Sequence, residues 1–270
     1  MRIAISQTQS QPGHIEASLA VMRQTAAAAL AQGAGLVIFP EMFLTGYNVG
    51  AAVFKLAEPV DGPSFQRAAA IARQAGVALL YGYPERDGDA VYNSALLIDR
   101  TGRPLANYRK AHLYGGEEKK LFAAGDRLVT AELDDLNVGI LICYDVEFPE
   151  AVRALAQAGA ELIAVPTALI RPFDIVARTL VPARAFENQV YVAYASMCGS
   201  EAGLGYCGLS CIVGPDGQDL ARAGTGPALL FADIDPAAIS RGRKENPYLT
   251  DRRPELYAAP VKRVRSPSEK

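Results

Sequence analysis

Two segments of this chain repeat one pattern: an apolar-striped helix, a glycine, a fully apolar strand and a proline. Residues 33–40 read Gly-Ala-Gly-Leu-Val-Ile-Phe-Pro, and residues 159–166 read Gly-Ala-Glu-Leu-Ile-Ala-Val-Pro. Long apolar strands are typical of sheets that are covered on both faces. The simplest interpretation is that two helix–strand units merely look alike. The alternative is a pseudo-two-fold fold in which each half supplies one sheet, with a site at strand ends near positions 41, 143 and 167.

Helical and strand-like segments alternate along the chain, which predicts a layered α/β protein. We expect one domain over residues 1–258, followed by a basic tail over residues 259–270. Helices are expected over 15–33, 61–76, 149–159 and 173–187. Strands are expected over 2–7, 36–39, 77–83, 91–98, 136–142 and 161–165, and near 190–195, 208–213 and 228–234.

Charge and hydropathy exclude several classes of function. Lys and Arg number 27 and Asp and Glu number 29, a net charge of −2, so no basic footprint for nucleic acid or an anionic membrane is expected. No apolar run approaches the ~18 residues of a transmembrane helix, and the first residues lack the apolar segment of a signal peptide. We therefore expect a cytoplasmic protein that binds neither nucleic acid nor membrane.

Histidine and cysteine are too sparse for the common metal sites. The chain has two histidines, His14 and His112, which exclude an HExxH or a Cys2His2 zinc site. Cys198, Cys207 and Cys211 are irregularly spaced, and we interpret them as core or loop thiols. We expect no metal and no cofactor.

Cys143 is a candidate nucleophile because of where it lies. It follows the apolar strand 136–142 and precedes a helix. A sharp strand-to-helix turn would expose its thiol and offer the backbone N–H of Tyr144 to an oxyanion. The alternative is a buried core cysteine.

Two charged residues beside apolar segments could assist such a nucleophile. Glu41 directly follows an apolar strand, so it is either a general base whose pKa is raised by burial or a carboxylate that caps the next loop. Lys110 has apolar and aromatic neighbours, so it either favours a thiolate and binds an oxyanion or belongs to a solvated Arg–Lys pair. Together with Cys143 they supply a base, a cation and a nucleophile without histidine.

The segments around these residues resemble the motifs of the nitrilase superfamily of carbon–nitrogen hydrolases, over essentially the whole chain. The motifs are Phe39-Pro40-Glu41, Tyr108-Arg109-Lys110-Ala111-His112-Leu113, and Leu141-Ile142-Cys143-Tyr144-Asp145-Val146-Glu147-Phe148-Pro149-Glu150. The resemblance implies a four-layer αββα sandwich with pseudo-two-fold halves. It also implies pairing through helices, so we expect a homodimer or a higher homo-oligomer.

Carried over by position, the resemblance implies that Glu41 is the general base, Lys110 the oxyanion cation and Cys143 the nucleophile. It further implies a second glutamate seven residues before the glycine of Gly125-Asp126, which is Glu118.

The segment of this second glutamate leaves two questions open. Glu117 is adjacent to Glu118, so the assignment between them is open, and a solvated charge run is the alternative for the whole segment. Glu117 is also a candidate contact for substrate.

Longer stretches resemble 5-aminopentanamidases and R-stereoselective amidases in particular. They are Glu41–Gly50, Tyr81–Arg86, Phe186–Gln189, Tyr206–Gly208 and Pro247–Asp251. The implied activity is hydrolysis of a small aliphatic amide, similar to 5-aminopentanamide, to carboxylate and ammonia through a thioester. The alternatives are an R-stereoselective or broad aliphatic amidase, or nitrile hydrolysis, N-carbamoyl cleavage or acyl transfer on the same fold. A partner-binding module without activity is disfavoured by the intact Glu41, Lys110 and Cys143.

The substrate contacts remain open at this point. Tyr47 and the backbone near Thr167 and Ala168 are candidates for the amide end. The ammonium of an ω-amino amide needs a carboxylate, whereas the carboxylate of an N-carbamoyl amino acid needs a cation. The carboxylate candidates are Glu117, Asp145, Glu147, Asp174 and Glu201, and the cation candidates are Arg171, Arg178 and Arg184.

Overall fold

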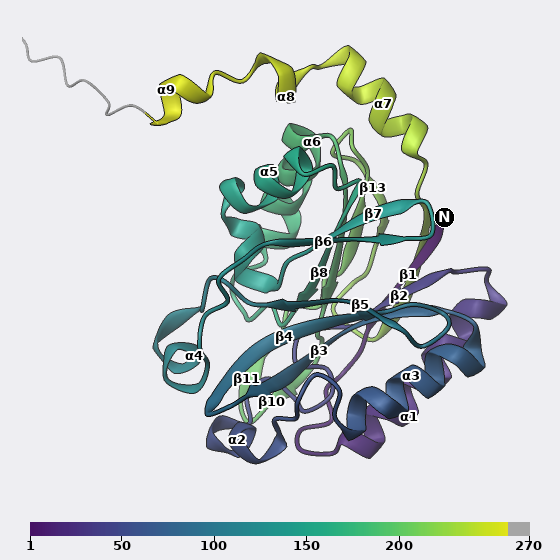
Figure 1. Cartoon of the computed structure of the whole chain (residues 1–270), viewed down its shortest axis with the longest axis vertical. Coiled ribbons are helices and arrows are strands. Elements are labelled where there is room, and N and C mark those ends of the chain that lie inside the picture. Colours follow the sequence, from purple (N-terminus) through teal and green to yellow (C-terminus); the bar gives the residue numbers. More distant parts are fainter. Residues whose placement is uncertain (259–270) are drawn as a thin grey trace, which may run out of the picture.

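The computed structural model describes residues 1–258 and contains two six-stranded sheets that face each other, as Figure 1 shows. The strands of the first sheet, in spatial order, are β14 (Ala228–Asp233), β1 (Arg2–Gln7), β2 (Leu36–Ile38), β3 (Ala78–Asp87), β4 (Ala90–Ile98) and β5 (Pro104–Arg109). Those of the second sheet are β13 (Asp219–Arg222), β12 (Cys211–Val213), β9 (Tyr191–Ser196), β8 (Leu162–Thr167), β7 (Leu136–Ile140) and β6 (Val129–Leu133).

The two sheets share one internal plan. In the first, β2 lies between β1 and β3 and runs parallel to both; in the second, β8 lies between β7 and β9 and also runs parallel to both. The outer strands of each sheet pair antiparallel. Because β2 and β8 are the strands of the repeated glycine-to-proline pattern, the interpretation of two related halves is confirmed.

Alternation along the strands distributes side chains between an inner and an outer core. Ile3 and Ile5 of β1 point into the core between the sheets, whereas Ala4 packs with Leu19 and Met22 of the outer helix. Such alternation follows from the two-residue period of a strand. The sheets are apolar on both faces because each is packed against the other sheet on one face and against helices on the other.

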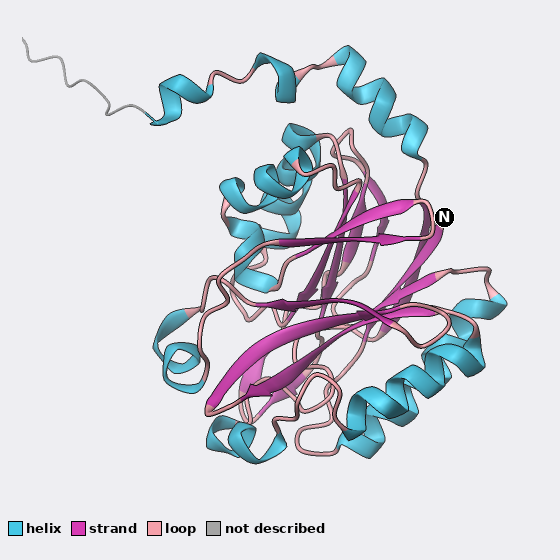
Figure 2. Cartoon of the chain, in the orientation of Figure 1, coloured by secondary structure: helices cyan, strands magenta, loops and turns pink. Residues whose placement is uncertain are grey.

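Helices form the two outer layers, which Figure 2 shows in cyan. α1 (Ile15–Ala31) and α3 (Pro63–Ala75) pack on the first sheet, and α5 (Pro149–Gln157) and α6 (Val181–Asn188) pack on the second. A π-helical turn over Val176–Leu180 leads into α6. The predicted αββα sandwich is therefore confirmed.

The remaining elements are short or peripheral. They are α2 (Val53–Leu56), α4 (Gly115–Leu121), β10 (Ser200–Glu201), β11 (Leu204–Gly205), α7 (Pro236–Glu245), α8 (Tyr248–Asp251), α9 (Pro254–Ala258), and 3-10 turns over Gly50–Ala52 and Cys143–Glu147. The last three helices form a C-terminal arm beside α6 (Figure 1), with Ile239 of α7 buried in the core and Tyr248 of α8 packed against Phe186 of α6. The predicted basic tail, residues 259–270, lies outside the described residues.

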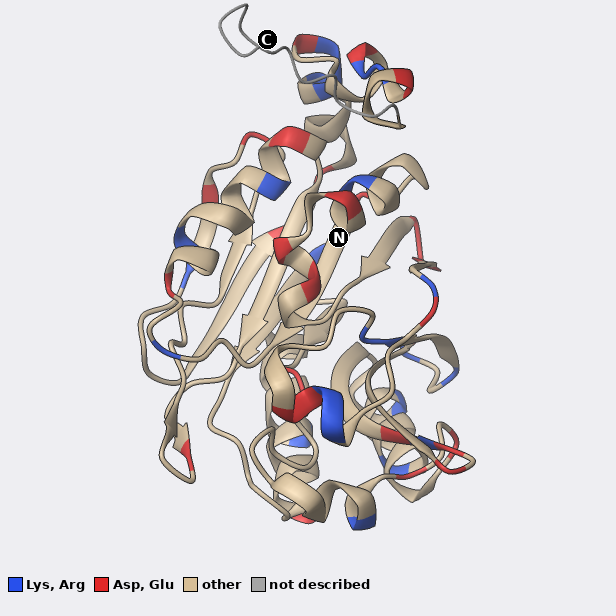
Figure 3. Ribbon diagram, turned by 90° about the vertical axis from the view of Figure 1, so that its left-hand side faces the viewer, with Lys and Arg blue, Asp and Glu red and all other residues tan. Residues whose placement is uncertain are grey.

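The described residues bear on two expectations, one about membrane spans and one about the distribution of charge. No helix among residues 1–258 has both the length and the apolarity needed to cross a membrane. In the view of Figure 3 acidic and basic residues are interspersed over the ribbon, and α4 carries both signs side by side.

Candidate active site

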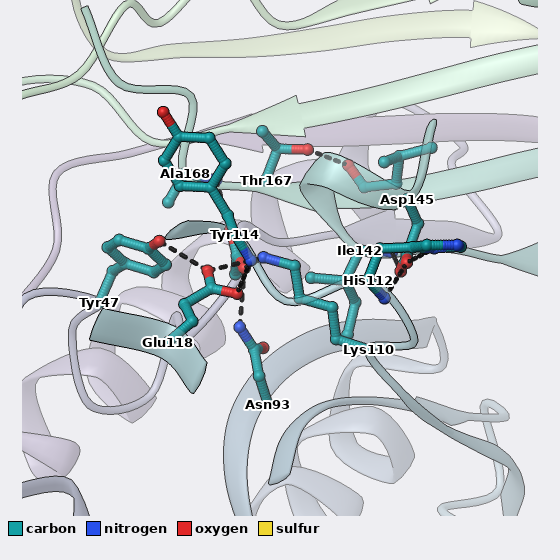
Figure 4. Close-up of polar contacts among 12 residues, drawn as sticks. Tyr47, Asn93, Lys110, His112, Tyr114, Glu118, Ile142, Asp145, Thr167 and Ala168 are labelled. Atoms are coloured by element: carbon teal, nitrogen blue, oxygen red, sulfur yellow. Dashed lines mark hydrogen bonds and ion pairs between the residues drawn. The ribbon is translucent and has the colours of Figure 1, made fainter. Parts of the chain in front are cut away.

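A buried chain of ionic contacts lies where loops from both sheets meet. Glu41 follows β2, Lys110 follows β5, and Glu118 lies on α4. Lys110 Nζ donates to Glu41 Oε1 at 2.8 Å and to Glu118 Oε1 at 2.7 Å, and all three side chains are buried. Figure 4 shows the side chains of Lys110 and Glu118 pointing towards one another. Burying three charges is costly unless each is paired, so this arrangement points to a function rather than to stability.

Both oxygens of Glu41 are held in place. Oε1 also accepts from Asn93 Nδ2 at 2.7 Å, and Oε2 accepts from the backbone N–H of Ala168 at 2.9 Å. Burial raises the pKa of Glu41 above its usual value, and the opposing effect of Lys110 is smaller. The result is an oriented carboxylate with increased basicity.

Asn93 also belongs to the site but was not predicted from the sequence. The only sequence feature that could have indicated it is a polar side chain within an apolar strand. That strand is β4, in which Asn93 is fully buried. Buried polar groups need a partner, and here the partner is Glu41.

The second glutamate of the cluster is Glu118, not Glu117. Glu118 accepts from the hydroxyl of Tyr47 at 2.6 Å and from the backbone N–H of Tyr114 at 2.8 Å. Glu117 is exposed and pairs with Lys120 at 2.5 Å. Consecutive residues of a helix point about 100° apart, so only one of the two glutamates in α4 can face Lys110.

Lys110 keeps its positive charge in this setting. Burial by itself lowers the pKa of the ammonium, but the negative charges of Glu41 and Glu118 raise it by more, so the net pKa lies above the usual value for lysine. The site thus contains a fixed cation whose two hydrogen bonds are already made to carboxylates.

Cys143 lies at a strained turn between β7 and the following 3-10 turn. Its backbone φ is +47°, a left-handed conformation that is uncommon for residues other than glycine. Burial raises the pKa of the thiol well above its usual value and the charge of Glu41 raises it further, while Lys110 and the Ala168 N–H act in the opposite direction. The thiolate-favouring effect expected of Lys110 is outweighed, and the resting sulfur is a protonated thiol that needs a base.

Asp145 joins the cysteine turn to the lysine segment. Its buried carboxylate accepts from the backbone N–H of Ile142 at 3.0 Å, the hydroxyl of Tyr108 at 2.8 Å and the backbone N–H of His112 at 2.8 Å. The His112 ring lies 2.7 Å from it through Nδ1 (Figure 4). With every oxygen engaged, Asp145 positions two loops and cannot serve as the partner of a substrate ammonium.

A pocket of about 250 Å³ opens above Cys143. Its lining is mostly aromatic and aliphatic and consists of Tyr47, Tyr114, Cys143, Tyr144, Glu147, Ala168, Leu169, Ile170 and Phe173. Such a small, largely apolar cavity with a few polar groups is typical of a site for a small molecule.

The other proposed substrate contacts divide between this pocket and the surrounding framework. Tyr47 and Ala168 line the pocket, although the Ala168 N–H is used to hold Glu41. Thr167 is buried and its hydroxyl donates to the carbonyl of Val165 at 3.1 Å. Glu147 lines the pocket.

The two remaining carboxylate candidates have other partners. Asp174 pairs with Arg178 at the surface, with 3.1 Å between them. Glu201 is buried and accepts from the backbone N–H of Tyr47 at 3.3 Å and of Asn48 at 2.6 Å. It therefore holds the loop that carries Tyr47.

None of the three arginine candidates lines the pocket. Arg178 pairs with Asp174 at the surface, and Arg171 donates to the carbonyl of Tyr206 at 3.2 Å. Arg184 is buried and donates to the carbonyls of Val146 and Glu147 at 3.0 and 2.8 Å.

The described part of the chain shows no arrangement for a metal ion: within residues 1–258 no three or more His, Cys, Asp or Glu side chains are grouped to hold one. The three cysteines other than Cys143 are buried and unpaired in this part of the chain.

Comparison with known proteins identifies the family of the chain. The model of the carbon-nitrogen hydrolase family matches residues 2–244. The chain is 52% identical over 260 residues to a Pseudomonas protegens protein named hydrolase in pqqF 5' region, covering 95% of this chain and 90% of the relative. It is 38% identical over 219 residues to an (R)-stereoselective amidase of a Pseudomonas species, covering 81% and 79%.

Solved structures of related amidases share the fold of this chain. The NitN amidase of Nesterenkonia sp. AN1 superposes with a TM-score of 0.86 at 40% identity, covering 95% of this chain and 98% of that one. A glutamate-to-glutamine variant of the amidase from that organism shows the acetamide moiety of fluoroacetamide added covalently at the active site cysteine. A cysteine-to-alanine variant is in complex with butyramide.

Proposed function

Because the chain belongs to the carbon–nitrogen hydrolase family of the nitrilase superfamily, we propose that Glu41, Lys110, Cys143 and Glu118 form the machinery of an amidase. Its substrate is a small aliphatic amide similar to 5-aminopentanamide, which it hydrolyses to carboxylate and ammonia. One observation carries the proposal: the buried Glu41–Lys110–Glu118 chain lies beside a strained cysteine under a small pocket.

The first half of the reaction acylates Cys143. Glu41 accepts the thiol proton as the sulfur attacks the amide carbon, forming the C–S bond and placing a negative charge on the carbonyl oxygen. Lys110 and the backbone N–H of Tyr144 stabilise that oxyanion. Glu41 then returns the proton to the amide nitrogen, the C–N bond breaks and ammonia leaves. The raised pKa of Glu41 suits it to both proton transfers.

The second half releases the acid. Glu41 accepts a proton from a water molecule, whose oxygen attacks the thioester carbon. The C–S bond then breaks, and the proton on Glu41 returns to the sulfur of Cys143. Glu118 acts by holding Lys110 from the side opposite Glu41, and Tyr47 and Tyr114 hold Glu118 in turn. A positioned group of this kind contributes roughly 10²–10⁴-fold to a rate.

The size and lining of the pocket support a short, unbranched substrate. Butyramide and the acetamide moiety of fluoroacetamide, the ligands of the Nesterenkonia amidase, are small aliphatic amides. An R-stereoselective amidase is the second candidate, favoured by the 38% identical Pseudomonas relative. An N-carbamoyl amino acid is disfavoured because no arginine or lysine of the described residues 1–258 lines the pocket.

Ammonia release from purified protein tests this function. The panel contains 5-aminopentanamide, hexanamide, a cyclic amino amide, a nitrile and an N-carbamoyl amino acid. We expect release from the linear amides and none above background from a Cys143→Ala variant that remains folded. Cys198→Ala, which removes a buried thiol outside the pocket, is the matched control and retains activity. Normal turnover by Cys143→Ala would refute the proposed nucleophile.

We also propose that the protein assembles into a homodimer or a higher homo-oligomer. The C-terminal arm of α7, α8 and α9 exposes large apolar side chains in α9, with Leu256 53% and Tyr257 65% exposed. Apolar side chains on an extended arm are typical of a segment that packs on another chain.

A further inference from the structure

The charges of the active site leave one carboxylate without a partner. Within residues 1–258, Lys110 is the only lysine or arginine in the cluster, and it is shared by Glu41 and Glu118. Glu147 is the further carboxylate in the lining of the pocket. If all four groups are charged, the site has one positive and three negative charges. A cationic ligand would reduce this imbalance, whereas an anionic ligand would increase it.

Glu147 is available to a ligand in a way that the other nearby carboxylates are not. Among residues 1–258 no lysine, arginine or histidine forms an ion pair with its carboxylate, and Arg184 donates to its backbone carbonyl instead. The side chain is half-buried at the pocket. Burial raises its pKa, and the positive charges of Lys110 and Arg184 lower it by less.

Aromatic rings complete the surroundings of this carboxylate. Tyr114 lies edge-to-face against Tyr144, with 5.3 Å between ring centroids, and against Phe173, with 6.3 Å. All three rings line the pocket together with Glu147. Faces of aromatic rings attract cations, and a carboxylate beside several rings is a common site for an alkylammonium group.

The local backbone sets the distance between the two ends of the site. Cys143 and Glu147 are the first and last residues of one 3-10 turn. A rise of about 2.0 Å per residue places their backbones roughly 8 Å apart along the axis of the turn. A separation of this size matches a ligand with several carbon–carbon bonds between its two functional groups.

We propose that Glu147, with the rings of Tyr114 and Phe173, binds a primary ammonium at the end of the substrate remote from the amide. Resting on the proposed amidase function, this inference names the substrate class: linear amides with an ω-ammonium group. Glu147 is thus a residue of specificity, and the amide chemistry at Cys143 does not depend on it.

A pair of isosteric amides tests the role of the ammonium. 5-Aminopentanamide ends in an ammonium group at the position where hexanamide ends in a methyl group. We expect Glu147→Gln to lower kcat/KM for 5-aminopentanamide by roughly 10- to 100-fold, mainly through KM, since one hydrogen bond to a charged group is lost. The kcat/KM for hexanamide should fall much less, so the ratio of the two kcat/KM values measures the contribution of the ammonium. Glu150→Gln, which removes an exposed carboxylate outside the pocket, is the matched control.

Charge reversal gives the inference a gain-of-function test. Glu147→Lys should turn the preference towards the monoamide of adipic acid, which carries a carboxylate where 5-aminopentanamide carries an ammonium. Equal losses for 5-aminopentanamide and hexanamide in Glu147→Gln would overturn the inference, as would a wild-type preference for hexanamide.

Binding of pentylammonium separates this inference from the proposed function. Measured by calorimetry on the Cys143→Ala protein, it should weaken roughly 10-fold or more when Glu147→Gln is added. If no amide is hydrolysed but pentylammonium binds in this Glu147-dependent way, the amidase proposal fails and the ammonium site stands. If amides are hydrolysed but pentylammonium binding ignores Glu147, the ammonium site fails alone.

Discussion

At the scale of single residues, Glu41 affects Cys143 in two opposite ways. Its negative charge raises the pKa of the thiol, which disfavours a standing thiolate. Its own raised pKa makes it a stronger base for the thiol proton. In the proposed mechanism the second effect matters, because the proton moves only as the sulfur attacks the amide.

The variant Glu41→Gln separates these two effects. Without the negative charge of Glu41, the positive charge of Lys110 stabilises the thiolate with less opposition. The pKa of Cys143 should therefore fall, and alkylation by iodoacetamide should extend to lower pH. Amide turnover should nevertheless fall by roughly 10²–10⁴-fold because the base is gone. Ammonia release and alkylation rates across pH measure both. Glu132→Gln, an exposed substitution, changes neither; retained turnover in Glu41→Gln would exclude the assigned base.

His112 links stability to pH. The hydrogen bond to Asp145 raises the pKa of His112 above its usual 6.5, and burial opposes this by less. A group with a raised folded-state pKa contributes stability that is fully present below about 6.5 and lost as the pH rises through the folded value. His112→Gln should therefore lower Tm more at pH 6 than at pH 9.

The pH test has its control in the other histidine. Thermal melts of His14→Gln, which changes an exposed ring ahead of α1, should differ from the wild type by the same small amount at both values. If His112→Gln lowers Tm by as much at pH 9 as at pH 6, the stabilising contact does not depend on the charge of His112.

At the scale of elements, strand ends and close backbone contacts fix the site. Gly82 of β3 lies against the loop that carries Glu41. A Cβ at this glycine would lie 2.3 Å from Met42 N and 2.7 Å from Glu41 Cα, far inside van der Waals contact. The absence of a side chain on β3 thus allows the Glu41 loop to approach Lys110.

Gly82→Ala should therefore move Glu41 and strain the sheet. We expect a loss of about 1–3 kcal/mol in unfolding free energy, the usual cost of overpacking, together with a fall in kcat. Chemical denaturation and ammonia release measure the two. The control is Gly226→Ala, where the added Cβ meets nothing within 4 Å. An active, fully stable Gly82→Ala protein would contradict this close packing.

The elements predicted from sequence were those with continuous apolar strands or striped helices. Besides the two-residue strands β10 and β11, the strands missed were β5, β6 and β13, and each of these three lies at the edge of a six-stranded sheet. Edge strands are exposed along one side and here carry mostly partly buried or exposed residues, so their sequences lack the apolar run that reveals central strands. α4 was missed because it begins with two glycines and is charged throughout.

Only some residues of the site could be predicted from the sequence. Positions directly after apolar strands marked Glu41 and Cys143. Asn93 and Tyr114 gave no comparable signal, because their roles depend on which loops meet in space rather than on neighbours along the chain. The choice between Glu117 and Glu118 likewise needed the orientation of α4.

At the scale of the whole molecule, the site exists only when the two sheets are packed together. Glu41, Asn93 and Lys110 come from loops and strands of the first sheet, and Cys143 and Ala168 come from loops of the second. The hydrogen bond from the Ala168 N–H to Glu41 joins the two halves directly. The repeated strand pattern of the sequence therefore indicates a protein of two related halves, and the site lies between these halves.

The C-terminal arm of α7, α8 and α9 leads to a prediction about assembly. Since Leu256 and Tyr257 of α9 expose apolar surface, we expect the wild type to form a homodimer or a higher oligomer, and Leu256→Asp with Tyr257→Asp to shift it towards monomer. Light scattering after gel filtration measures this, with the exposed pair Glu132→Gln and Glu150→Gln as control. Because the residues of the proposed site all come from one chain, the monomeric variant should still release ammonia. A double aspartate variant that keeps the wild-type mass would show that other surfaces hold the chains together.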